Sequence, residues 1–267
     1  MAQKMTISAK LLERGITISG EINGPYKCVV PLSGGKDSQA CLVLALQRFL
    51  PSEILALFCD TQFEHLWTYE HINNVVIETG VDLVTLNAGS VLSVCTKYKR
   101  FPGGGARHCT DELKIRPSKF FYKALAEQQG GFEIWYGMRS DESTEREKRY
   151  RGKLAEELYP PHEVMPRKYP KYLDKLGISM KLPVLEHSTS EVFDLLEGKQ
   201  NPLYFFGWSR VGCFPCLAGG EKDQVAAFNF DETGRKHYKI AEQISEIAGR
   251  PILTTKKYGG GCAICSI

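Results

Sequence analysis

Several patterns that mark common protein classes are missing from this chain. No uncharged apolar run reaches the roughly 20 residues that a membrane-spanning helix needs. The six histidines show no HxxxH or HExxH spacing, so we do not expect a histidine metal site. GxSxG and GxxxxGK[ST] are also absent, which excludes a nucleophile elbow and a P-loop. Glu13 and Arg14 lie where a signal peptide would need an apolar core, so we expect a cytoplasmic protein without membrane association.

The chain also lacks a strong charge imbalance, internal repeats and low-complexity segments. Its formal net charge is +3, so the overall charge calls for neither a nucleic-acid nor a membrane partner. The content of 43% hydrophobic and 24% charged residues is ordinary for a globular protein. With 267 residues, the chain has room for one large domain and a substantial extension.

Expected strands and helices alternate through the first half of the chain. We expect strands at 26–32, 52–60, 81–88 and 132–138, and helices at 38–50, 64–80, 117–131 and 188–200. Gly80 should end the second helix and Ser190 should cap the last, while 89–109 and 144–182 look irregular. This order predicts an α/β fold with a doubly wound parallel sheet. We expect an N-terminal extension over 1–24, the main domain over 25–217, and a helical, cysteine-bearing lobe with a Gly/Cys tail over 218–267.

A glycine-rich loop separates the first expected strand from its helix. It consists of Ser33, Gly34, Gly35, Lys36, Asp37 and Ser38. Ligands of open α/β sheets bind at the carboxyl ends of strands, where two glycines let backbone N–H groups approach. The helix N-terminus and Lys36 add positive charge, and Asp37 could hold Mg²⁺ or cap the helix. The loop therefore predicts a phosphate or pyrophosphate site, because a simple capped turn needs neither the second glycine nor the lysine.

Five ordered motifs narrow this prediction. They are SGGKDS at 33–38, CDTQFEHLWTYEHI at 59–72, HCTDELKIRP at 108–117, YGMRSDES at 136–143, and the segment at 182–216 that runs through NPLY to GCFPC. Together they resemble the phosphoadenylylsulfate (PAPS) reductase family of the PP-loop, or N-type, ATP pyrophosphatases. The second motif has Gln62 where glycine is usual. The resemblance implies an adenine nucleotide α-hydrolase-like, Rossmann-like fold.

The resemblance also implies roles for individual residues. The 33–38 loop would bind the phosphates of ATP, PAPS or adenylylsulfate (APS), and the strand end from Phe58 to Thr61 would border the adenosine. The remaining candidates are Lys114 and Arg139 for neutralising the nucleotide, Asp60 and Glu64 for Mg²⁺ or the ribose, and Glu142 for holding Arg139. Lys36, Asp37 and Arg139 are the candidate catalytic residues of the loop region, with Lys36 expected in a solvent-facing position. Each alone would be typical of a surface ion pair, but their place within matched motifs favours function.

The nine cysteines fall into two groups. Cys28, Cys41, Cys59 and Cys95 have apolar surroundings and are expected in the core. The other five lie in expected loops, and they are Cys109, Cys213, Cys216, Cys262 and Cys265. Loop CxxC pairs in a reducing compartment favour metal or redox chemistry over disulfides. Cysteine ligands suit a [4Fe–4S] cluster or Zn²⁺, and the resemblance to cluster-bearing APS reductases favours the cluster.

The tail and the first cysteine motif depart from the reductase pattern. Those reductases carry Cys-Cys where this chain has His108-Cys109, so one ligand is missing. Cys265 would replace it, or the cluster would keep three protein ligands and an open iron that could carry sulfide. Cys262 and Cys265 could also act as a nucleophile or sulfur carrier, or do neither, and the ECGLH-like ending of the reductases is absent.

Three functions remain open from the sequence. The favoured one is an enzyme of sulfur metabolism that binds ATP and Mg²⁺, adenylates an acceptor, releases pyrophosphate and so activates the acceptor for sulfur transfer. The second is a PAPS or APS reductase that uses a tail cysteine, and the third is a nucleotide-binding subunit without catalysis. A sulfur- or electron-donor protein is an expected partner. The basic stretch at 143–153 indicates either a solvated helix face or a nucleic-acid contact, and the oligomeric state stays open.

Overall fold

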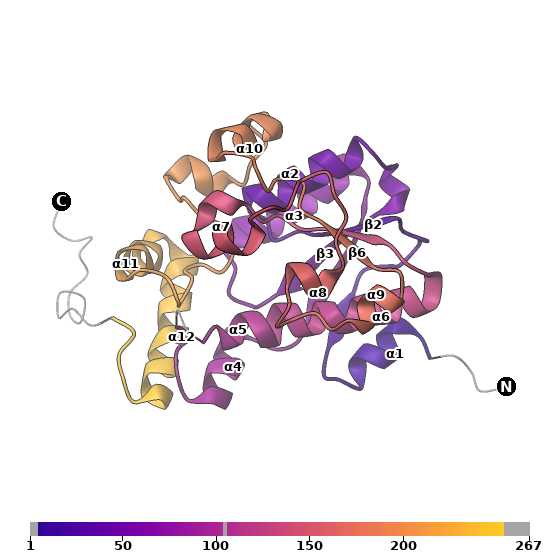
Figure 1. Ribbon diagram of the computed structural model, residues 1–267. Coiled ribbons are helices and arrows are strands. Elements are labelled where there is room, and N and C mark those ends of the chain that lie inside the picture. The colour runs from indigo at the N-terminus through magenta and orange to yellow at the C-terminus, as the bar shows by residue number, and fades with distance from the viewer. Residues whose placement is uncertain (1–4, 104–105, 254–267) are drawn as a thin grey trace.

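The computed structural model describes residues 5–103 and 106–253, so Cys262 and Cys265 lie outside the described residues. Six strands form one sheet in the order β1-β4-β3-β2-β5-β6, in which β1 runs antiparallel to β4 and every other pair is parallel. The strands are β1 (Thr17–Ser19), β2 (Cys28–Pro31), β3 (Ile54–Asp60), β4 (Asp82–Asn87), β5 (Glu133–Trp135) and β6 (Ser179–Lys181). The doubly wound α/β prediction is confirmed (Figure 1).

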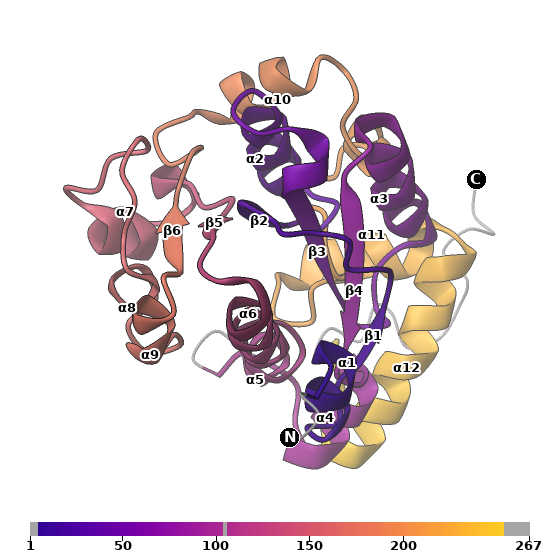
Figure 2. The same ribbon diagram turned by 90° about the vertical axis from the view of Figure 1, so that its right-hand side faces the viewer.

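Helices cover both faces of this sheet (Figure 2). They include α1 (Ile7–Leu12), α2 (Lys36–Leu46), α3 (Leu66–Thr79), α6 (Arg116–Gln129) and α10 (Thr189–Leu196). Successive strand residues point to opposite faces, so Val29 and Leu55 pack with the core under α6, whereas Val30 and Ala56 pack under α2 and α3. A parallel sheet buried on both faces explains why its strands read as continuous apolar runs.

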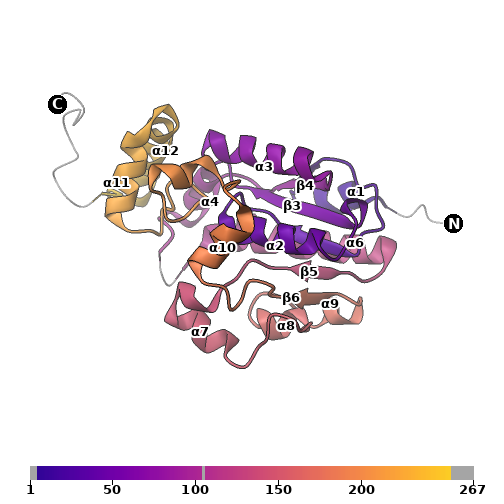
Figure 3. The same cartoon turned by 90° about the horizontal axis from the view of Figure 1, so that it is seen from above.

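The C-terminal part of the described chain packs at one end of the sheet. Its helices α11 (Glu221–Phe230) and α12 (Glu232–Ala248) lie beside α4 (Val91–Tyr98), as Figures 1 and 3 show. Buried Val94, Phe228 and Ile244 join one apolar cluster that links the three helices. Within the described residues, no helix is both long and apolar enough to cross a membrane.

Short connecting elements complete the described chain. They are η1 (Pro51–Glu53), α5 (His108–Thr110), the π-helical turn η2 (Asp111–Ile115), η3 (Ser140–Glu142), α7 (Thr144–Tyr150), α8 (Pro161–Val164), α9 (Tyr172–Lys175) and η4 (Pro202–Phe206).

Several expected boundaries need correction. The region 89–109 is not wholly irregular, because the Ser90 side chain accepts a bond from the Ser93 N–H and starts α4. The region 144–182 contains three helices and the sixth strand. The cap of α10 is Ser188 rather than Ser190, since Ser188 forms a capping box with Glu191. Gly80 ends α3 in the left-handed conformation, as predicted.

Candidate functional site

The glycine-rich loop follows β2 and leads directly into α2. Gly34 has a φ of +75°, and a Cβ there would lie 2.5 Å from the Thr68 Cγ2. Gly35 caps α2 without a side chain, so Asp37 is not the cap and lies in the first turn instead. Glycine is therefore required at position 34 both by conformation and by space. The helix N-terminus is left facing the loop without a side-chain cap, which suits an anion.

Two serines hold the loop in shape. The Ser38 hydroxyl donates to the Gly35 carbonyl at 2.8 Å and accepts the Ser33 N–H at 3.1 Å. The Ser33 and Ser38 hydroxyl oxygens are also 3.1 Å apart. These bonds join the two ends of the loop, so its N–H groups are positioned before any ligand arrives.

The NPLY turn secures the loop from the C-terminal half of the chain. Fully buried Asn201 donates to the Gly34 carbonyl and to the Thr68 hydroxyl, both at 3.3 Å. The Tyr204 hydroxyl accepts the Lys36 backbone N–H at 2.9 Å. Burial raises the pKa of Tyr204 to about 12, so this hydroxyl keeps its proton. The sequence analysis included this turn in a matched motif. It did not predict that Asn201 and Tyr204 hydrogen-bond to the glycine-rich loop.

Lys36, Asp37 and Arg139 lie together at the start of α2. The Lys36 ammonium lies 3.1 Å from one Asp37 oxygen, and the Arg139 Nε donates to the other at 2.7 Å. Arg139 also contacts Asp141 and Thr189 and is only 4% exposed. Lys36 is 5% exposed, so its expected solvent-facing position is wrong: it begins α2 and is covered by the structure around the loop.

Glu142 does not hold Arg139. It forms its ion pair with Arg146 of α7, while Asp37 and Asp141 pair with Arg139. Burial lowers the pKa of Arg146, and the nearby Arg210 guanidinium lowers it further. An arginine whose charged form is disfavoured by a second guanidinium is typical of a site that an anion occupies. The sequence prediction missed both arginines.

Gly137 brings this second motif against the loop. A Cβ at Gly137 would lie 2.8 Å from the Asp37 carbonyl and from the Ser38 N–H nitrogen. All of these neighbours are backbone atoms, which cannot move aside cheaply. Glycine is thus the residue that allows the chain after β5 to approach the start of α2.

Two adjoining cavities open at the loop. The smaller has a volume of about 150 Å³ and lies against Ser33, Gly35, Lys36, Ser38 and Arg146. The larger has a volume of about 420 Å³, and Phe193 and Trp208 form part of its wall. Both cavities share Lys36, Glu142, Tyr204 and Arg210. The smaller pocket thus has three cationic side chains and the carboxylates of Asp37 and Glu142, and the roomier pocket beside it has aromatic residues in its wall.

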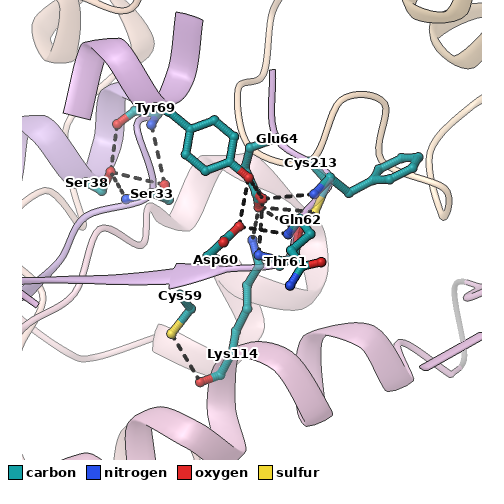
Figure 4. A network of polar contacts seen from close by, with 12 residues as sticks. Ser33, Ser38, Cys59, Asp60, Thr61, Gln62, Glu64, Tyr69, Lys114 and Cys213 are labelled. Carbon is teal, nitrogen blue, oxygen red and sulfur yellow. Dashed lines mark hydrogen bonds and ion pairs between the residues drawn. The ribbon is translucent and has the colours of Figure 1, made fainter. Parts of the chain in front are cut away.

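A polar network surrounds the end of β3, which is the strand next to β2 (Figure 4). The Asp60 carboxylate accepts the Gln62 N–H at 2.8 Å and the Tyr69 hydroxyl at 2.7 Å. Gln62 has a φ of +57°, the left-handed region that favours glycine. This explains, from the backbone alone, why glycine would suit that position. Phe58 and Thr61 are buried beside this network.

Glu64 lies at the centre of the network and is 3% exposed. Its carboxylate accepts the Thr61 hydroxyl at 2.7 Å and the N–H groups of Thr61 and Phe63, both at 3.2 Å. The Lys114 ammonium lies 3.7 Å away. These contacts give Glu64 a bracing position, and the roles expected for Asp60, Glu64 and Lys114 at the nucleotide stay predictions.

Cys213 joins the same network through its thiol. Its Sγ lies 3.4 Å from the Thr61 hydroxyl and donates to Glu64 at 3.8 Å. Burial raises the pKa of Cys213 to about 11, against the opposing effect of Lys114. Burial alone would lower the pKa of Lys114, but Cys213 and Glu64 outweigh it and the net change is a rise. At neutral pH the thiol is therefore protonated and the amine charged.

Among the three described loop cysteines, Cys216 affects the pKa of the other two. Burial raises the pKa of Cys109, and the Cys216 sulfur raises it further; Cys216 also acts on Cys213. Thiolates suit zinc or an iron–sulfur cluster, so the donor chemistry fits three positions of such a site. Among residues 5–103 and 106–253, however, no group of three or more His, Cys, Asp or Glu side chains is arranged to hold a metal ion. The metal ligands stay a prediction.

Of the four cysteines expected in the core, three are fully buried: Cys28, Cys41 and Cys95. Cys59 is partly buried, and its sulfur lies 3.2 Å from the Ser118 hydroxyl.

Known proteins of several kinds are similar to this chain. An uncharacterised 37.8 kDa protein of Escherichia phage 186 is 25% identical, over 75% of this chain and 70% of its own length. An uncharacterised Methanocaldococcus jannaschii protein is 26% identical over 71% of this chain, which is only 36% of its own length.

Two solved structures are also similar. The PAPS reductase of Candida auris in its phosphate complex has a TM-score of 0.48 and 14% identity, over 79% of this chain and 90% of its own. The U34-tRNA thiolase NcsA of Methanococcus maripaludis with its [4Fe–4S] cluster has a TM-score of 0.43 and 17% identity, over 98% of this chain and 86% of its own.

A family model gives the identification. The phosphoadenosine phosphosulfate reductase domain matches residues 27–218, well over half of the chain, and this range holds both cavities and the three described loop cysteines. The chain belongs to the phosphoadenosine phosphosulfate reductase domain family, a family of nucleotide-binding enzymes of sulfur chemistry.

Proposed function

We propose that this protein binds ATP with Mg²⁺, transfers the adenylyl group to an acceptor and releases pyrophosphate, so that the acceptor becomes reactive towards a sulfur donor. The observation that carries the proposal is the 150 Å³ cavity at the start of α2, lined by Lys36, Arg146 and Arg210. Its size and charge suit a pyrophosphate group, which carries several oxygens that backbone N–H groups and cations can bind together.

The residues of the chain divide the work of binding. The loop N–H groups and Lys36 bind and orient the phosphates, while Arg146 and Arg210 neutralise the charge that gathers on the departing pyrophosphate. Arg139 donates to Asp37, Asp141 and Thr189 and also lines the larger cavity, so it positions Asp37 and adds positive charge to that cavity. Mg²⁺ would neutralise phosphate charge when bound, and the Asp37 carboxylate at the loop would hold it.

The experiment compares substrates on the full-length protein. With single-stranded RNA and DNA supplied as acceptors and sulfide as the sulfur donor, the release of AMP and pyrophosphate from ATP is measured beside sulfite release from PAPS and APS. Lys36→Met should lower ATP turnover by at least about 100-fold, because a positioned charge on the phosphates is lost while the apolar stem still fills its buried site. The matched control is Lys199→Met, which removes an exposed lysine close to α2 and should leave turnover unchanged.

Other product patterns contradict the proposal. Sulfite from PAPS or APS, with no AMP from ATP, would identify a reductase. Tight ATP binding without turnover by the wild type would identify a binding subunit. Normal turnover in Lys36→Met would remove the phosphate loop from the mechanism.

We also propose that Cys109, Cys213 and Cys216 ligate a [4Fe–4S] cluster, with Zn²⁺ as the alternative metal and Cys262 or Cys265 as candidates for the fourth ligand. Support comes from the cysteine-only donor set and from the effect of Cys216 on the pKa values of Cys109 and Cys213. A cluster supplies thiolate-bound iron that can carry electrons or sulfide.

Metal analysis after purification without oxygen tests the cluster. We expect about four irons and four sulfides per chain, with an absorption band in the visible. Cys213→Ala should lose most of the iron, whereas Cys41→Ala, which removes a core thiol under α2, should retain it. One zinc without sulfide would contradict the cluster, and full iron in Cys213→Ala would contradict the ligand assignment.

A further inference from the structure

The segment after α10 presents an unusual set of exposed side chains. Phe205 is 65% exposed and Phe206 is 60% exposed, in a chain where most large apolar side chains are buried. The Phe206 ring lies 5.2 Å from the Trp67 ring, so the two form a tilted aromatic pair at the surface. Exposing aromatic rings to water is unfavourable in free energy, and exposed apolar patches often mark a site that a partner covers.

The same segment supplies walls and charge to the larger cavity. Tyr204 and Trp208 line it, and Phe193 of α10 meets the Tyr204 ring edge-to-face at 5.2 Å. Arg210 is exposed and also lines the cavity, and no carboxylate of the described chain forms an ion pair with it. Residues 204–210 thus combine four aromatic side chains with one arginine that forms no ion pair with a carboxylate of the described chain.

Helix α7 adds further positive charge at the same opening. Residues 144–153 hold five basic and two acidic side chains, and Lys148, Arg149 and Arg151 are exposed. Glu142, just before α7, lines both cavities with Arg210. Arg146 of α7 lines the smaller cavity together with Arg210, which places this helix beside the opening.

We propose that this surface, made of Phe205, Phe206, Trp208, Arg210 and the exposed basic residues of α7, binds single-stranded nucleic acid and admits one nucleotide into the larger cavity. Positively charged grooves that carry exposed rings bind single strands, because phosphates pair with the cations and bases stack on the rings. A volume of about 420 Å³ suits one nucleotide unit.

The inference rests on the proposed function for its chemical meaning: the admitted nucleotide would be the acceptor that is adenylated beside the phosphate loop. The hydroxyl, amide or carbonyl oxygen of that nucleotide would attack the α-phosphorus of ATP, a new P–O bond would form, and the bond to pyrophosphate would break. Binding itself does not require the reaction, so the two proposals can fail separately.

The test measures fluorescence anisotropy of labelled 12-nucleotide single strands, one RNA and one DNA of the same sequence, with the full-length protein. We expect binding at 50 mM KCl that weakens steeply at 200 mM. The double variant Phe205→Ala/Phe206→Ala should weaken binding by roughly 5- to 150-fold for each base that stacks. Arg210→Gln should weaken binding and reduce the salt slope by about one.

Matched controls lie away from this surface. Ile77→Ala removes an apolar side chain of α3 that is 78% exposed, and Lys175→Gln removes an exposed charge just before the amino end of β6. Both should bind the strands as the wild type does. The ratio of RNA to DNA affinity identifies which strand the surface prefers.

Three results would overturn the inference: no binding of either strand at 50 mM KCl, equal losses in the controls and the surface variants, or equal competition by polyglutamate, which would indicate an acidic-peptide site. Strand binding without ATP turnover would overturn the proposed function alone. ATP turnover without strand binding would overturn this inference alone.

Discussion

The ends of the neighbouring strands β2 and β3 carry two polar regions that are built differently. After β2, the loop is held by side chains from distant segments, including Asn201 and Tyr204, and its buried charges are paired within the protein. After β3, Glu64 is braced mainly by its own turn, while Cys213 reaches it from the C-terminal half as a protonated thiol.

The difference indicates which region is ready for its ligand. The loop region already has its backbone N–H groups and cations in place, so an anion can bind without rearrangement. In the β3 region, burial raises the pKa of both Cys59 and Cys213 to about 11. A metal would have to displace the Cys213 proton before it could bind there, which makes metal binding proton-releasing and pH-dependent.

Of the variants that distinguish the two regions, Arg139→Leu should have the largest effect on stability and on ATP binding. The change leaves the Asp37 carboxylate, which is largely buried, with Lys36 as its remaining described ion-pair partner, and it removes four contacts of the guanidinium. Breaking a buried pair by removing one partner costs about 3–5 kcal/mol. We expect a fall of that size in the free energy of unfolding, measured by urea denaturation, and loss of ATP binding.

Asp141→Asn is the matched control on the same guanidinium. The Asp141 side chain is 50% exposed, so its pair with Arg139 should contribute less than about 1 kcal/mol. If both variants lost the same stability, the loop region would not depend on the buried charge pair.

The sequence predicted the loop region better than its surroundings, for a physical reason. Local requirements such as glycine at position 34 leave a mark in the sequence, because a left-handed turn tolerates few other residues. The roles of Asn201 and Tyr204 depend on contacts across more than 160 residues, which no local pattern records. The error on Lys36 has the same origin, since the residues that bury it come from later segments.

The missed strand β6 shows a similar limit. It has three residues, and its last is Lys181, whose ammonium lies 3.1 Å from Glu156 and over the Trp135 ring. A buried lysine in so short a strand breaks the apolar pattern by which strands are recognised. The fold class was nevertheless predictable, because the central strands are continuously apolar.

An intermediate effect is expected from Glu64→Gln in the β3 region. The amide keeps one acceptor oxygen, but its NH₂ group would face backbone N–H groups that now donate to the carboxylate. Those N–H groups would lose their acceptor. Leaving a buried donor unsatisfied costs about 1–3 kcal/mol. The loss should appear in urea denaturation, while ATP affinity should change less than in Arg139→Leu. An equal loss of ATP affinity would show that the two regions act as one site.

The smallest expected effect is on the pH dependence of stability, to which one buried histidine in each region contributes. His71 lies beneath the loop region, with its Nε2 2.9 Å from the Gln39 Oε1, and burial lowers its pKa. His237 lies in the cysteine region, stacked on Phe63, and burial lowers its pKa as well.

Below about pH 6.5 the unfolded chain binds protons that the folded protein does not, so the free energy of unfolding should fall as the pH drops from there to the folded pKa values. His71→Gln should remove one part of this slope between pH 7 and 5, and His237→Gln should remove another. If the reductions in slope add in the double variant, the two histidines titrate independently. If the slope is unchanged in both single variants, neither histidine stays neutral in the folded protein.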